Sequence, residues 1–93
     1  MIRRLVLDVL KPHDPGLIAF TEHVDAIDGV AGVTAKLVEI EENVRAIRVS
    51  IEGEDLDPDV IDAEIADLGG SIHSIDEVSC GERIVEDDWL PLR

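Results

Sequence analysis

The alternation of apolar and polar residues between positions 32 and 53 predicts a β-hairpin, and the rest of the chain covers one of its faces. Two runs rich in β-branched residues, Thr34–Glu41 and Val44–Glu52, flank the polar pair Glu42–Asn43, which suits a turn. In the second run, apolar residues occupy every other position, which marks one buried face: Ile47, Val49 and Ile51.

The first run is less regular, because its apolar residues fall in both phases of the alternation. Two interpretations stay open: a β-bulge near Leu37–Val38 shifts the register, or the sheet is apolar on both faces. We favour the second, because the first strand of the chain repeats the pattern. The face away from the helices would then carry an exposed apolar patch of Val6, Leu10, Val38, Ile40, Val44 and Ala46.

Two further strands are predicted at the ends of the domain. Ile2–Leu10 alternates so that Leu5, Leu7 and Val9 face the helices. Ser71–Cys80 alternates more weakly and is anchored by Ile72, Ile75 and Val78.

Two helices are predicted between these strands, each beginning at an Asp-Pro pair. Asp14–Pro15 and Asp57–Pro58 supply a capping carboxylate and a proline that fits the first helical position. Gly29 and Gly69–Gly70 end the helices. The buried stripes are Leu17, Ile18, Thr21, Val24 and Ile27 in the first helix, and Ile61, Ile65 and Leu68 in the second.

The order strand, helix, strand, strand, helix, strand predicts an α+β, ferredoxin-like β-α-β-β-α-β sandwich. Right-handed crossovers place the first and third strands in the middle of a four-stranded antiparallel sheet with both helices on one face. This domain covers residues 1–81. Residues 82–93 form an acidic C-terminal tail whose Trp89 favours docking onto a surface, while its carboxylates favour disorder, and both alternatives stay open.

The net charge of −14, from 22 acidic and 8 basic residues, disfavours nucleic acid and anionic membranes as partners. It favours cation binding or life in high salt, and we expect a salt-loving source. The single cysteine, Cys80, excludes an internal disulfide and indicates a reduced, cytoplasmic setting. No signal peptide or membrane-spanning segment is predicted.

Four stretches together resemble an archaeal family called domain of unknown function 211: MIRRLVLDVLKPH, the hairpin, IEGEDLD and DLGGSIHSIDEV. The resemblance implies a ferredoxin-like fold and closed homo-oligomers, and it implies no agreed activity. The acidity indicates a haloarchaeal member. The tail Glu82–Arg93 departs from the short ending that the resemblance implies.

Two groups of residues are candidates for a divalent cation such as calcium or magnesium. His13 and Asp14 follow the first strand in a loop without cysteine, which leaves only a nitrogen–oxygen site. The alternative is a helix cap beside a surface histidine. On or near the last strand, His73, Asp76 and Glu77 would bind together with residues of a neighbouring subunit such as Glu39 or Glu41. The alternative is a solvated strand face.

We therefore consider three functions. The first is a homo-oligomeric binding or regulatory module that holds a small molecule or a hard cation between subunits. The second is an oligomeric scaffold that recruits a protein partner through its tail or sheet face. The third, an enzyme, is the least favoured, because no nucleophile–base pair or phosphate-binding loop occurs.

Overall fold

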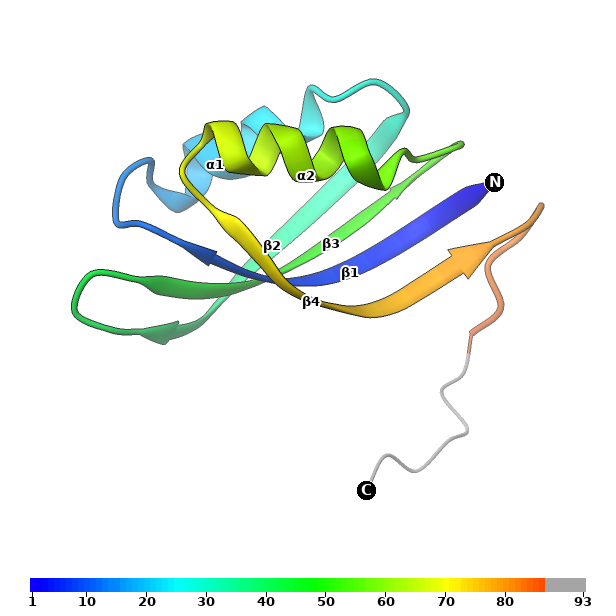
Figure 1. Cartoon of the computed structure of the whole chain (residues 1–93). Helices are drawn as coiled ribbons and strands as arrows, with labels where there is room; N and C mark the ends of the chain where they lie inside the picture. The colour runs from blue at the N-terminus through cyan, green and yellow to red at the C-terminus, as the bar shows by residue number, and fades with distance from the viewer. Residues whose placement is uncertain (87–93) are drawn as a thin grey trace.

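The computed structural model describes residues 1–86, and Trp89 with the rest of the predicted tail from position 87 lies outside the described residues. The described chain has four strands and two helices in the predicted order (Figure 1). Their bounds are β1 Ile2–Lys11, α1 Leu17–Asp25, β2 Val30–Ile40, β3 Arg45–Gly53, α2 Pro58–Asp67 and β4 Ser71–Cys80.

The strands form one antiparallel sheet in the order β2-β3-β1-β4, so β1 and β3 lie in the middle and β2 and β4 at the edges. Both helices cover the same face of this sheet, and the opposite face has no helix over it (Figure 1). This arrangement is the ferredoxin-like α+β fold, as the sequence predicts.

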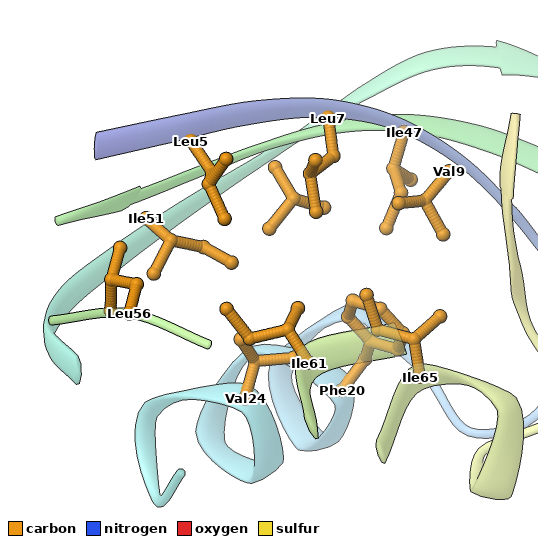
Figure 2. Close-up of a cluster of buried hydrophobic side chains, with 11 residues drawn as sticks. Leu5, Leu7, Val9, Phe20, Val24, Ile47, Ile51, Leu56, Ile61 and Ile65 are labelled. Carbon is orange, nitrogen blue, oxygen red and sulfur yellow. The ribbon is translucent and has the colours of Figure 1, made fainter. Parts of the chain in front are cut away.

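The hydrophobic core fills the space between the sheet and the helices (Figure 2). Inward-facing residues of β1 and β3 supply the sheet side, because alternate residues of a strand share a face. They are Leu5, Leu7, Val9, Ile47, Val49 and Ile51. The helical side consists of Phe20 and Val24 from α1, Ile61 and Ile65 from α2, and Leu56 just before α2.

The second helix begins as its sequence predicts. One carboxylate oxygen of Asp57 accepts from the backbone amides of Asp59 at 3.0 Å and Val60 at 3.4 Å, and Pro58 occupies the first turn. At the other end the helix stops before Gly69, whose φ of +83° lies in the left-handed region.

The first helix differs from its prediction at both ends. It begins at Leu17 with Gly16 as the N-cap, and no side chain caps it. Asp14 is not the cap, because Pro15 and Gly16 separate it from the first helical residue and carry its carboxylate away from the first free amides. The helix ends before Ala26, and Gly29 lies instead in the turn that leads into β2, with a φ of +90°.

The buried face of α1 also differs from the predicted stripe. Phe20 and Val24 are fully buried and Ile27 is partly buried, which is the expected i, i+4, i+7 spacing. Ile18 is 76% exposed, and its prediction as a core residue is wrong. A residue two positions before Phe20 lies on nearly the opposite side of the helix, so Ile18 and Phe20 cannot both face the sheet.

A close approach of two glycines joins the start of β2 to the end of β3. The amide of Glu54 donates to the carbonyl oxygen of Gly29 at 3.0 Å. A Cβ on Gly53 would overlap that carbonyl oxygen, and one on Gly29 would lie 2.9 Å from the carbonyl oxygen of Glu54. Both positions therefore need glycine.

The β-bulge predicted near Leu37–Val38 is present in β2. Leu37 pairs with Ile47, and the next paired residue is Glu39, so Val38 is the extra residue. Beyond the bulge, Glu39 shares the uncovered face with Ala46, while Ile40 is turned to the helix side. The favoured interpretation, a continuous apolar patch on the uncovered face, is therefore wrong. Within the paired strands this face keeps Val6, Leu10 and Ala46 of the predicted patch, each half-buried, and Val44 lies in the turn before β3.

Candidate functional site

Charge is distributed unevenly between the two layers. Neither residues 12–35 nor residues 49–82 contain a lysine or arginine, and these ranges include both helices. The uncovered face of the sheet, in contrast, carries Arg4, Lys36 and Arg48. The helical layer is therefore strongly anionic, while the uncovered face of the sheet carries both signs of charge.

Arg4 is the centre of the charge network on the uncovered face. Its guanidinium forms ion pairs with Glu52 at 2.7 Å, with Glu77 at 3.1 Å and with Glu86 at 3.1 Å. These three hydrogen-bonded carboxylates, that of Glu86 first, raise the pKa of Arg4 further above its ordinary value. The pair with Glu86 brings the start of the tail against this face, which Figure 1 shows opposite the helices.

Two bulges in β4 change the predicted alternation of that strand. Register shifts against β1 leave His73 and Asp76 as extra residues. Ser74 donates to Asp76 at 2.8 Å, and Arg48 lies 3.7 Å from the other carboxylate oxygen of Asp76. Asp76 is thus already engaged within its own chain.

The candidate cation ligands are not brought together within one chain. Glu39 lies near the end of edge strand β2 and Glu41 just after it, whereas His73 and Asp76 lie on the opposite edge strand β4. Three strand spacings separate these edges, about 14 Å. Among residues 1–86, no group of three His, Cys, Asp or Glu side chains is placed to hold a metal ion.

His13 and Asp14 lie together in the loop after β1, close to two cations. The Nδ1 atom of His13 is 2.8 Å from the guanidinium of Arg45. Asp14 is near enough to Lys11 to raise its pKa, which opposes the larger effect of burial. A divalent cation at this loop would therefore be repelled by the positive charges of Lys11 and Arg45.

Lys11 is a residue that the sequence analysis missed. It is 3% exposed, and its ammonium donates to the carbonyl oxygen of Pro12 at 2.8 Å. Burial lowers its pKa, and the nearby charge of Arg45 lowers it further. The signal was present, because Lys11 continues the phase of Leu5, Leu7 and Val9 and therefore points inward.

Exposed apolar side chains gather on the two edge strands. They are Leu37, Val38 and Ile40 on β2, each between 48% and 61% exposed, and Ile75 and Val78 on β4, at 52% and 50%. The prediction that Ile75 and Val78 anchor β4 in the core is therefore wrong. Next to them, between α2 and β4, lies an apolar groove of about 230 Å³ lined by Leu5, Leu7, Ile61, Ile72 and Ile75.

Within residues 1–86, neither helix has the length or the apolar composition required to cross a membrane.

Comparison with known proteins identifies relatives along nearly the whole chain. Residues 3–92 match the model of the family DUF211, described as "Uncharacterized ArCR". An uncharacterized protein of Methanocaldococcus jannaschii is 43% identical over 90 residues, which cover 97% of this chain and 93% of that protein. Because both matches run into the tail, the expectation that the tail departs from the family is wrong.

Proposed function

The chain belongs to the DUF211 family, and from this premise we propose that it is a homo-oligomeric binding module and not an enzyme. The observation that carries this proposal is the collection of half-exposed apolar side chains on both edge strands of the sheet. Clusters of exposed apolar side chains on a small domain mark interaction sites. Its position at two opposite edges favours contact between copies of the same chain.

The edges fit each other in direction. β2 and β4 run antiparallel within the sheet, so a neighbouring copy can set its β4 antiparallel beside β2. The bulges at Val38, His73 and Asp76 interrupt continuous backbone pairing, so side chains would make the contact. We therefore place the end of the β2–β3 hairpin of one copy against the α2–β4 groove of the next. Such a head-to-tail contact closes into a ring when the rotation between copies permits.

This association would also assemble the candidate cation ligands. Glu39 and Glu41 of one copy would approach His73 and Asp76 of its neighbour, because both pairs lie beside the edges that meet. Carboxylate oxygens suit calcium or magnesium. The anionic helical layer supports a haloarchaeal, salt-screened setting, and it opposes binding to nucleic acid or to an anionic membrane.

The test is the native mass, measured by light scattering in molar KCl with and without a chelator. Ile75→Asp places a charge in the groove and should reduce the mass to that of one chain. Ile18→Asp, on the exposed side of α1, is the matched control and should leave the mass unchanged. A loss of mass on chelation would support cations at the contacts. A single-chain mass for the unmodified protein would overturn the proposal.

A second candidate function is an oligomeric scaffold that recruits a protein partner through its tail or sheet face. It is favoured by the uncovered sheet face and by the ion pair that brings Glu86 against it. Deletion of residues 82–93 should then abolish capture of the partner and leave the native mass intact. Loss of mass on deletion would count against this function.

A further inference from the structure

A second groove lies at the start of α1 and shares no lining residue with the α2–β4 groove. Its volume is about 170 Å³. One part of its lining is apolar, formed by Leu17, Leu37 and Ile47. The other part is polar and basic, formed by Lys11, His13 and Arg45. A pocket with apolar walls and a few convergent polar groups is the usual form of a small-molecule site.

The two cations of this groove have no ionic partner among residues 1–86. No carboxylate lies within 4 Å of the Lys11 ammonium or of the Arg45 guanidinium, although the chain has 22 acidic residues. Lys11 is the only charged side chain that is buried in the described part of the chain. A buried charge is costly unless it is paired, and within residues 1–86 the Lys11 ammonium has the carbonyl oxygen of Pro12 as its hydrogen-bond partner but no carboxylate.

The start of α1 adds further donors on the same side. Gly16 lines the groove, and its carbonyl oxygen accepts from Phe20 at 3.0 Å, which closes the first turn. No side chain caps the first amides, and the first turn contains no acidic residue. In α2, by comparison, the carboxylate of Asp57 satisfies two of these amides. A Cβ on Gly16 would meet no atom within 4 Å, so the groove is open beside Gly16.

We propose that this groove binds a small organic monocarboxylate with a short aliphatic chain. The carboxylate would accept from the Lys11 ammonium and the Arg45 guanidinium, and the aliphatic chain would pack against Leu17, Leu37 and Ile47. The Arg45 guanidinium already donates to the carbonyl oxygen of Glu41 at 3.2 Å and contacts His13, so it offers the carboxylate its remaining N–H groups. Asp14 is near enough to Lys11 to act on its pKa, and its negative charge disfavours a second negative charge on the ligand. The site goes beyond the proposed function, although its wall residue Leu37 also belongs to the β2 edge that we place at the contact between copies. Isovalerate binding and native mass are separate measurements, so failure of one proposal is distinguishable from failure of the other.

Calorimetric titration of the full chain with isovalerate tests this site. The matched ligand 3-methylbutan-1-ol has the same branched chain and no carboxylate. Lys11→Met and Arg45→Met each remove one cation of the groove and should weaken isovalerate binding at least about tenfold, since each loses a charge-assisted hydrogen bond. Lys36→Met removes the same charge from the exposed uncovered face and should leave binding unchanged.

Amide chemical shifts give a second measurement that does not depend on the stability of any variant. Isovalerate should shift the amide signals of Gly16 and Leu17 in the unmodified chain. No saturable binding up to roughly 50 mM would overturn the proposal. Equal affinity for the alcohol, or equal loss in the Lys36→Met variant, would overturn it as well.

Discussion

Phe20→Ala is the substitution that tests the packing of α1 most directly, with Ile18→Ala as its control on the same helix. Phe20 is fully buried between α1 and the sheet (Figure 2), and Ile18 is 76% exposed. Removing a buried phenylalanine side chain costs its transfer free energy and leaves a cavity, together about 3–5 kcal/mol. An exposed side chain outside any special contact changes stability by no more than about 0.5 kcal/mol.

A chain of this length has a free energy of unfolding of about 5–14 kcal/mol, so the Phe20→Ala variant loses a large fraction of it. Urea unfolding at one fixed KCl concentration, followed by far-ultraviolet circular dichroism, measures both variants. The midpoint should fall strongly for Phe20→Ala and stay in place for Ile18→Ala, with equal slopes. If both variants lost the same stability, or Ile18→Ala lost more, the assignment of the buried face of α1 would be wrong.

Three further predictions follow from contacts described above. Burial lowers the pKa of Lys11 below its ordinary value of 10.5, so the unfolded chain binds more protons between the two values and the free energy of unfolding rises with pH across that window. Denaturant midpoints measured at increasing alkaline pH should show this rise, and the Lys11→Met substitution should abolish it. An identical rise in the variant would contradict the prediction. Gly53→Ala should destabilise the fold because its Cβ overlaps the carbonyl of Gly29, and a melting temperature within about 2 °C of the unmodified chain would count against this. Arg4→Gln should lower the free energy of unfolding by about 1 kcal/mol at low salt, because the three carboxylate partners of Arg4 are half-exposed. This loss should shrink in molar KCl, and a loss of stability that does not depend on salt would indicate another cause.

The sequence predicts most of the fold because its local signals agree with the tertiary structure. β3 alternates cleanly, and Asp57–Pro58 begins α2 as expected. Asp14–Pro15 carries the same local signal and fails, because α1 starts two residues later, at Leu17. Nothing in the dipeptide itself distinguishes the two cases, since the position of the first turn is set by how Phe20 and Val24 pack against the sheet.

The candidate sites are less predictable, because they depend on how strands pair. A β-bulge moves every residue beyond it to the opposite face of the sheet. The extra residue Val38 therefore turns Ile40 to the helix side, and the two bulges of β4 invert its alternation twice. The burial of Lys11 follows from the alternation of β1 and could have been predicted from that phase. The proximity of Arg45 could not, because Arg45 reaches Lys11 only through the pairing of β1 with β3.

The central position of β1 has a consequence for how the chain folds during synthesis. β1 is made first, yet one of its two neighbours is β4, which is made last, and Leu5 pairs with Val78. At about 5–20 residues per second, several seconds pass on the ribosome before that partner exists. Until then β1 can pair only with β3, and its other edge offers unpaired backbone groups to any strand nearby. The nascent domain therefore presents the middle of its finished sheet as a temporary open edge, and completion of β4 removes it.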